Sequence, residues 1–188
     1  MKTVLIGAIV AAIIVFVYQA MSWMVLPFHE GSMKYTPQQD AILATLSQHL
    51  NEDGLYALPN VPPGSSQEEH EKVNAEMVGK PWAMVFYHRA YTGAMTGQMV
   101  YGFIINLVAA LLLAYTMWST REKLGGFAGR MGLVLAFVGF LIMQSSLMDA
   151  NWWDAPWHWL TGEITDHVLG WVLAGSWLAW WVGRKKSI

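Results

Sequence analysis

Four long apolar stretches stand out in the pattern of hydrophobic and polar positions along the chain. They cover roughly residues 3–27, 93–118, 130–148 and 167–183, and none has a charged residue in its interior. A helix needs roughly 20 predominantly apolar residues to cross the hydrocarbon core of a bilayer. The pattern therefore predicts an all-α membrane protein built on a bundle of four transmembrane helices, with residues 1–188 forming a single membrane domain.

The first and last stretches each need a further argument. The apolar run after Lys2 is longer than the core of a signal peptide, which is roughly 7 to 15 residues, and no small-x-small cleavage site follows it. We therefore expect an uncleaved anchor. The stretch between His167 and Arg184 is short, so it needs its flanking aromatic residues to complete a span.

Residues 28–90 separate the first two spans and begin with a helical pattern. Thr36 and Gln39 have the spacing of a capping box, and Pro37 stands at the first helical position, where its missing N–H costs nothing. Apolar residues then recur every four positions up to Leu50. These features predict an amphipathic helix at the start of this insert.

The rest of the insert predicts a hairpin. GLYALPN and PWAMVFYHR place aromatic or branched residues at alternating positions, as short strands do. Between them lies a polar segment with a short helix expected around residues 68–76. We therefore expect a small helix-plus-hairpin insert between the first two transmembrane helices.

Small residues recur at four-residue spacing along the chain. Such spacing lets helix backbones approach closely in lipid, where association depends on packing. It therefore favours a compact bundle over separate anchors. The pairs are Gly7 with Ala11, Gly93 with Gly97, Gly125 with Gly129, and Gly170 with Ala174.

The charges are distributed unevenly between the segments that connect the spans. One side receives seven of the eleven basic residues and a single acidic residue, Glu122, whereas the other receives twelve of the thirteen acidic residues. Lys and Arg are enriched in short cytoplasmic loops. We therefore expect both termini in the cytoplasm and the insert outside it. The seven basic residues are Lys2, Arg121, Lys123, Arg130, Arg184, Lys185 and Lys186.

Composition supports a membrane location and excludes several classes of function. Hydrophobic residues make up 55% of the chain and charged residues 13%, against about 25% charged residues in soluble proteins. A net charge of -2 without a concentrated basic patch argues against a nucleic-acid partner. The chain has no cysteine, which excludes disulfides, thiolate metal sites and cysteine nucleophiles.

The segment DANWWDAPWHWLTGEITDH, residues 149–167, gathers tryptophan, histidine and acidic residues between the last two spans. Tryptophan is favoured at lipid headgroups, so we interpret the segment as an interfacial loop whose acids, including Asp166, face water. Pro156 and Gly162 are expected to interrupt any helix here. We expect its tryptophans, and those near the end of the last span, to contact lipid or partner proteins. These are Trp152, Trp153, Trp157, Trp159, Trp177, Trp180 and Trp181.

The same segment also has residues that suit a metal ion. Glu163 and His167 are four positions apart and would share a helix face. His29, His88 and His158 are expected at a similar depth on the outward side, and histidine with carboxylate suits Zn, Mn or non-haem Fe. We therefore name His88, His158, Glu163 and His167 as candidate metal ligands, with His29 as a further imidazole; no other cofactor is predicted.

Uncharged polar residues lie mainly toward the outward halves of the spans. Interhelical hydrogen bonds account for them, and the spans hold no charged residue for proton- or ion-coupled transport. No GxSxG motif, SxxK motif or phosphate-binding loop is present, so the protein is not expected to be an enzyme. The polar residues are Tyr18, Gln19, Ser22, Gln98, Asn106, Gln144, Ser145, Ser146 and Ser176.

Two segments resemble small four-span bacterial inner-membrane proteins of unknown function. They are AAIIVFVYQAMSWMVLPF in the first span and ITDHVLGWVLAGSWLAWW at the end of the chain. The resemblance implies a bacterial origin and a four-helix fold in the inner membrane. It transfers no catalytic residue, and residues 28–90 depart from the shorter loop of such proteins.

These features predict a non-catalytic multi-pass protein of the bacterial inner (plasma) membrane. We expect it to contact the lipid bilayer and other membrane-protein subunits, as an accessory or structural subunit of a larger complex of the respiratory or photosynthetic type. The alternative is a small membrane metal-binding protein or oxidoreductase with an outward-facing His/carboxylate site. A small-molecule carrier that uses the polar outward halves of the first three spans is a third hypothesis.

Overall fold

The computed structural model describes residues 1–184 and divides the chain into two compact units. The first unit joins residues 1–34 to the segment that begins at Ala94, and the second covers residues 35–93. The second unit thus starts at Tyr35, later than the predicted insert, because the turn Pro27–His29 packs against the last helix of the first unit.

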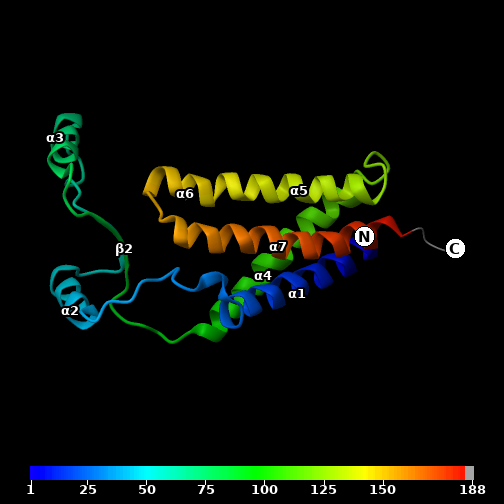
Figure 1. The fold of residues 1–188 in the computed structure, drawn as a ribbon, viewed down its shortest axis with the longest axis horizontal. Helices are drawn as coiled ribbons and strands as arrows, with labels where there is room; N and C mark the ends of the chain where they lie inside the picture. Colours follow the sequence, from blue (N-terminus) through cyan, green and yellow to red (C-terminus); the bar gives the residue numbers. More distant parts are fainter. Residues whose placement is uncertain (185–188) are drawn as a thin grey trace. The chain divides into compact units, whose positions relative to one another are not determined.

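Long helices build the first unit, as Figure 1 shows. Within residues 1–184, three helical stretches are long and apolar enough to cross a membrane: α1, α4, and α5 continued by α6. α7 is not among them because its six tryptophans and the polar turns at its start lower its mean hydropathy. The elements are α1 (Lys2–Met24), the 3-10 turn η1 (Pro27–His29), α4 (Met95–Ser119), α5 (Phe127–Gln144), α6 (Ser146–Trp153) and α7 (Trp157–Gly183).

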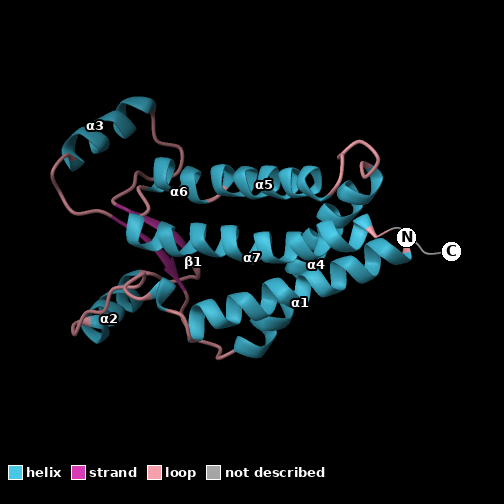
Figure 2. Ribbon diagram, turned by 45° about the vertical axis from the view of Figure 1, so that its right-hand side comes forward, coloured by secondary structure: helices cyan, strands magenta, loops and turns pink. Residues whose placement is uncertain are grey.

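The helices of the first unit pack as neighbours in the order α4, α1, α7, α5. α1 contacts both α4 and α7 along its length, and α7 also contacts α5. Figure 2 shows α7 between α5 and α1. α4 and α5 have few contacts with each other. The packing is therefore tight between α4 and α1, between α1 and α7 and between α7 and α5, and open between α4 and α5.

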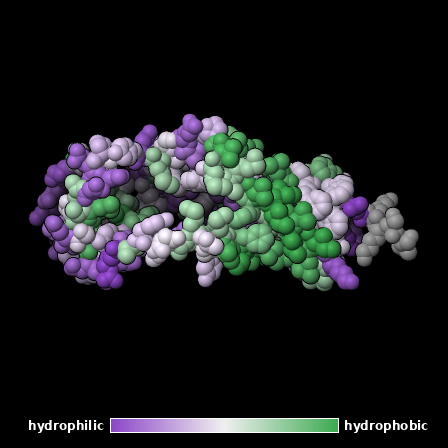
Figure 3. Space-filling view, turned by 90° about the horizontal axis from the view of Figure 1, so that it is seen from below, coloured by the Kyte–Doolittle hydropathy of each residue, from purple (hydrophilic) through white to green (hydrophobic). Residues whose placement is uncertain are grey.

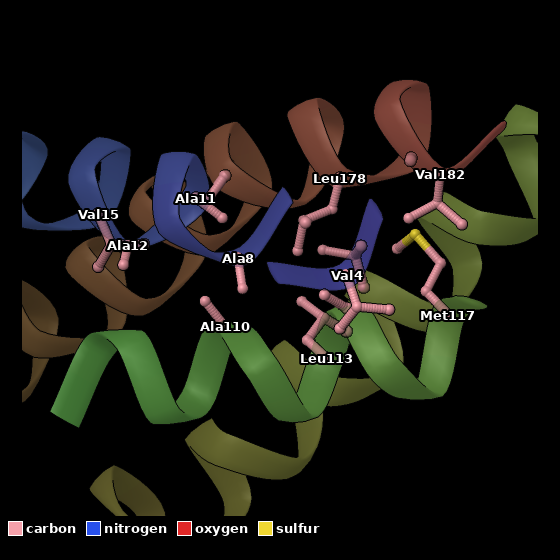
Figure 4. Close-up of a cluster of buried hydrophobic side chains, with 14 of the residues drawn as sticks. Val4, Ala8, Ala11, Ala12, Val15, Ala110, Leu113, Met117, Leu178 and Val182 are labelled. Carbon is pink, nitrogen blue, oxygen red and sulfur yellow. The ribbon is translucent and has the colours of Figure 1, made fainter. Parts of the chain in front are cut away.

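Small side chains let α1 lie close to its neighbours. Figure 4 shows Ala8 of α1 facing Ala110 of α4, with Leu178 of α7 nearby. A Cβ atom at Gly7 would lie 2.8 Å from Cδ1 of Trp181, so glycine is required for this approach. The core shared by α1, α4 and α7 is Val4, Ala8, Ala11, Ala12, Val15, Ala110, Leu113, Ala114, Met117, Ala174, Leu178, Ala179 and Val182.

Two of the four predicted small-residue pairs lie in this core, and two do not. Gly7 with Ala11, and Gly170 with Ala174, are buried at the contact between α1 and α7, as predicted. The pairs that begin at Gly93 and Gly125 are wrong, because both of these glycines precede their helices with φ angles of 64° and 62°. There they serve left-handed turns, which glycine adopts without steric cost.

The prediction that residues 149–167 form a loop is wrong. α6 continues to Trp153, and α7 begins at Trp157, well before the predicted start of the last span. Only residues 154–156 are not helical, because Asp154 is left-handed (φ 49°) and Pro156 occupies the N-cap of α7. Gly162 does not interrupt α7; it is buried against a neighbouring element. Near this point the predicted third span is also divided, at Ser145, into α5 and α6.

Two helices and a two-stranded ribbon build the second unit. They are α2 (Gln39–His49), β1 (Gly54–Leu58), α3 (Gln67–Met77) and β2 (Ala83–Tyr87). The strands are antiparallel, with Gly54 opposite Tyr87 and Leu58 opposite Ala83. The predicted helix, hairpin and short helix are therefore confirmed.

The helix caps of the second unit differ from the prediction. α2 has no side-chain cap, and Thr36 Oγ1 accepts a hydrogen bond from the backbone N–H of Gln38 at 3.2 Å instead. A complete capping box forms at α3, where Ser66 and Glu69 each bond the other's backbone N–H. These hydrogen bonds from Ser66 lower the pKa of the Glu69 carboxyl.

Candidate functional site

A buried polar cluster joins α1, η1 and α7 of the first unit. Nε2 of His29 lies 3.0 Å from Oδ2 of Asp166, and Oγ of Ser22 donates a hydrogen bond to Oδ1 of Asp166. The side chains of His29 and Asp166 are only 6% and 10% exposed, and Ser22 is fully buried. Asp166 therefore uses both carboxylate oxygens to hold α1 and η1 against α7.

The local sequence brings His29 to this position. Pro27 starts the 3-10 turn that follows α1, and this turn carries the histidine back toward α7. At Gly162 a Cβ atom would lie 2.7 Å from Nδ1 of His29, so only glycine lets the imidazole lie against the α7 backbone. The ring of Trp23 stacks on the imidazole with centroids 3.8 Å apart and planes 11° apart. The imidazole is thus fixed on two sides.

Tyr18 extends the cluster one helical turn along α1. Its ring packs at Gly170, where a Cβ atom would lie 3.1 Å from Cδ1 of the tyrosine. Within residues 1–184, neither its buried hydroxyl nor Nδ1 of His29 has a hydrogen-bond partner. Both groups can donate or accept, so these two atoms are where the cluster has unused hydrogen-bonding capacity.

A second polar contact joins α1 to α4. Nδ2 of Asn106, a residue only 7% exposed, donates a hydrogen bond to Oε1 of Gln19 at 2.7 Å. Together with the bond from Ser22 to Asp166, it confirms that polar residues of the first two predicted spans make hydrogen bonds between helices. Ser145 and Ser176 instead bond carbonyl oxygens of their own helices.

Three of the predicted metal ligands lie on α7. His158 is exposed, and its backbone carbonyl accepts a hydrogen bond from Ser32 Oγ at 3.3 Å. Glu163 is partly buried, and Nε2 of His167 lies 3.4 Å from Oγ of Ser145. Within residues 1–184, no group of three or more His, Cys, Asp or Glu side chains is arranged to hold a metal ion.

The fourth predicted ligand, His88, belongs to the second unit. Its Nδ1 lies 3.3 Å from Oδ2 of Asp53, and the two side chains are 71% and 52% exposed. Oδ1 of the same aspartate accepts hydrogen bonds from the backbone N–H and from Nε of Arg89. These contacts lower the pKa of the Asp53 carboxyl, with the backbone N–H of Arg89 as the largest cause and His88 next.

Asp166 is the site residue whose position differs most from the sequence prediction. It was expected to face water ahead of the last span, but α7 starts earlier and turns this carboxylate into the contact with α1. A signal was available in the spacing. Gly162, Asp166 and Gly170 are four positions apart on one face of α7, and Tyr18 and Ser22 are four apart on α1. When α1 packs against α7, Gly170 lies against Tyr18 and Asp166 lies against Ser22.

The predicted contact tryptophans divide into an exposed and an internal group. Trp152, Trp153 and Trp157 are more than half exposed, at 67%, 53% and 62%. By contrast, Nε1 of Trp177 donates to the carbonyl of Gly7 at 3.1 Å, and Nε1 of Trp181 donates to the carbonyl of Thr3 at 2.8 Å. Trp177 and Trp181 therefore join α7 to α1. Of the remaining two, Trp159 is partly buried near Trp23, and Trp180 is half exposed.

The geometry of the cluster suits a fixed polar contact better than nucleophilic catalysis. In a Ser-His-Asp triad the imidazole takes the proton of the serine hydroxyl. Here Ser22 donates to the aspartate, so the carboxylate lies between the hydroxyl and the imidazole. Asp166 orients His29 through Nε2, and this contact selects the position of the imidazole.

Comparisons of the chain with protein-family models, with curated proteins and with solved structures found no match.

Proposed function

We propose that this protein is a four-span protein of the bacterial inner membrane that acts by contact, as a non-catalytic accessory or structural subunit of a larger membrane complex. A complex of the respiratory or photosynthetic type is the kind we favour. The observation that carries the proposal is an apolar cleft of about 220 Å³ in the first unit, at the side where α4 and α5 barely touch.

The cleft has the properties of a binding site for apolar side chains. Leu112 of α4 and Phe140 of α5 flank it and are 61% and 70% exposed. Trp171 of α7 and the core residues Leu113 and Val138 also line it. Each other pair of neighbouring helices in this unit is closed by direct packing, so a partner helix at the cleft would complete the one open side.

The outer surface of the first unit supports insertion in a membrane. Figure 3 shows an extended hydrophobic surface, in green, over its helices. Soluble monomers rarely expose apolar patches of this extent. The exposed apolar residues include Leu5, Ile6, Ile9, Ile13 and Val17 of α1, Ile104, Ile105, Val108 and Leu112 of α4, and Leu135, Phe137 and Phe140 of α5.

Two features support α7 as the fourth span. It has 27 residues, and at a rise of 1.5 Å per residue such a helix exceeds the bilayer core of roughly 30 Å. It also packs along α1, which is itself apolar enough to span. An even number of spans puts both chain ends on one side, together with Arg121 and Arg130, and the positive-inside rule makes that side cytoplasmic. Lys185 and Lys186, which add to the same expectation, lie outside the described residues.

Photo-crosslinking in the native membrane tests the proposal. A photoreactive amino acid at position 112, in the cleft, is compared with one at Ile13, which is 46% exposed on α1 and does not line the cleft. We expect position 112 to capture a discrete membrane protein that also co-purifies with the wild-type chain in mild detergents, and Ile13 to capture little. A stable monomer without a partner in several mild detergents would contradict the proposal.

A second candidate function is a membrane metal-binding protein or oxidoreductase. His29 and Asp166 favour it, because they form a buried imidazole-carboxylate pair in which Nδ1 of His29 has no partner within residues 1–184. His158, Glu163 and His167 lie on the same helix as Asp166. Metal analysis of protein purified without an affinity tag tests this candidate. A metal content far below one ion per chain would contradict it.

A further inference from the structure

A polar pocket lies at the other end of α1 from His29. Its volume is about 650 Å³, and it is formed where the start of α1, the end of α4, the start of α5 and the end of α7 meet. All of these elements belong to the first unit. Three arginines, Arg121, Arg130 and Arg184, line the pocket together with one acidic residue, Glu122.

Two of these arginines are held at the rim. Nη1 of Arg121 donates to the carbonyl of Trp118 at 2.7 Å, and the guanidinium also lies 4.8 Å from the centroid of that indole ring. The guanidinium of Arg184 lies 4.4 Å from the centroid of Trp180. A guanidinium has five N–H donors, so these contacts fix both groups and leave most of their donors unused.

The third arginine is built into the wall of the pocket. Nε of Arg130 donates to the carbonyl of Ala179 at 2.6 Å, which ties the start of α5 to the end of α7. The guanidinium lies against Gly183, where an added Cβ atom would overlap Nη2. Glycine at position 183 therefore makes room for the guanidinium, and a side chain there would displace it.

Carboxylates within residues 1–184 neutralise little of this charge. Oε1 of Glu122 lies 3.5 Å from Nη2 of Arg121, but the Glu122 side chain is 87% exposed. In that part of the chain, neither Arg130 nor Arg184 forms an ion pair with a carboxylate. A concave surface lined by charges of one sign attracts ions of the opposite sign.

We propose that this pocket binds a phosphate group, with Arg121, Arg130 and Arg184 as its ligands. Arginine binds phosphate oxygens through parallel N–H donors, and a charge-assisted hydrogen bond is stronger than a neutral one. A phospholipid headgroup and free phosphate offer the same chemistry. The lipid source rests on the membrane insertion proposed above, whereas free phosphate would bind without it.

Calorimetric titration of the full chain in an uncharged detergent distinguishes the two sources. One arm titrates inorganic phosphate, with chloride at matched ionic strength as the control. The other titrates phosphatidylglycerol in mixed micelles, with phosphatidylcholine as the control lipid without net charge. Saturable binding of inorganic phosphate would show that the free anion is enough to fill the pocket. Saturable binding of phosphatidylglycerol without binding of inorganic phosphate would show that the pocket requires the lipid headgroup. Absence of saturable binding in both arms overturns the proposal, whatever the outcome of the partner crosslinking.

Paired variants test whether the arginines act as a site and not only as a positive surface. Arg121→Gln with Arg184→Gln should weaken binding about tenfold or more, which corresponds to about 1.4 kcal/mol. Lys123→Gln removes the same type of charge from the loop between α4 and α5, but Lys123 does not line the pocket. It should change the affinity less than about twofold, because an exposed charge is screened by salt.

Gly183→Ala is the more discriminating variant, because it keeps every charge. It displaces the Arg130 guanidinium and should also weaken binding about tenfold, an effect comparable to losing one charge-assisted hydrogen bond. Circular dichroism and gel filtration check that each variant is folded. The charge substitutions and Gly183→Ala test the pocket independently. Equal losses in Lys123→Gln and the double arginine variant, or wild-type affinity in folded Gly183→Ala, overturn the proposal.

Discussion

The two units each contain a histidine beside an aspartate, and the two pairs differ in nearly every other respect. In the first unit, His29 and Asp166 are 6% and 10% exposed and 137 residues apart in sequence. In the second, His88 and Asp53 are 71% and 52% exposed and 35 residues apart. At similar distances between ring nitrogen and carboxylate, the first pair joins the turn η1 to α7, and the second joins the residue before β1 to the residue after β2, at one end of the ribbon.

The difference lies in what happens when one partner is lost. Around an exposed pair, water and salt replace and screen the lost contact, so its energetic contribution is small. Around a buried pair, the remaining polar group stays without a partner in surroundings of low dielectric constant, which is costly. Substitutions at the buried pair should therefore lower stability more than substitutions at the exposed pair.

Asp166→Ala should have the largest effect on stability. It removes the acceptor of both Ser22 and His29 and leaves these groups buried, so the free energy of unfolding should fall by about 3 kcal/mol. Denaturant unfolding in detergent measures the change. Thr161→Ala, on the exposed face of α7, is the matched control and should change stability by less than about 0.5 kcal/mol. Equal effects of the two substitutions would contradict burial of Asp166.

Gly162→Ala should have the next largest effect. The new Cβ atom would lie 2.7 Å from Nδ1 of His29 and push the imidazole away from α7, and overpacking of this type costs about 2 kcal/mol. Gly139→Ala in α5 is the matched control, because no atom lies within 4 Å of a Cβ atom there. That change should be neutral or stabilising by up to about 1 kcal/mol. A neutral Gly162→Ala would show that His29 does not lie against α7.

The smallest effect is expected from acidification of the exposed pair. The pKa of Asp53 is lowered in the folded state, so its stabilising contribution is complete above the ordinary aspartate pKa and is lost as the pH falls through the folded value. Hydrogen-exchange protection of β1 and β2 should therefore fall slightly at acid pH. Asp53→Asn should remove this pH dependence, and Glu52→Gln should preserve it. An unchanged pH dependence in Asp53→Asn would assign it to another group.

Periodicity and apolar length predicted the helices and the hairpin well, because both depend on local pattern. α1 and α4 start within about two residues of the predicted spans, since a long apolar run without charges is typical of a helix that can cross a membrane. The alternation of aromatic or branched residues with other residues predicts β1 and β2. The start of α7 was missed because its first turns are polar, and the surfaces that accept those side chains belong to a segment more than 100 residues away.

The candidate site was predicted only in part, for the same reason. The sequence predicts His29 as an imidazole on the outward side, but it predicts that its partner Asp166 faces water, since sequence spacing does not show which helices pack together. Gly162 is predicted to interrupt a helix, whereas in the structure it is a helical position that leaves room for the imidazole of His29. The pocket lined by Arg130 and Gly183 likewise depends on tertiary packing of α5 against α7.

A pair of double-mutant cycles tests most directly the claim that a buried histidine-aspartate contact joins η1 to α7. Unfolding free energies are measured for His29→Ala, Asp166→Ala and the double variant, and in parallel for His88→Ala, Asp53→Ala and their double variant. We expect a coupling of about 1 kcal/mol or more for His29 with Asp166 and none measurable for His88 with Asp53. Additive effects of His29→Ala and Asp166→Ala would contradict it.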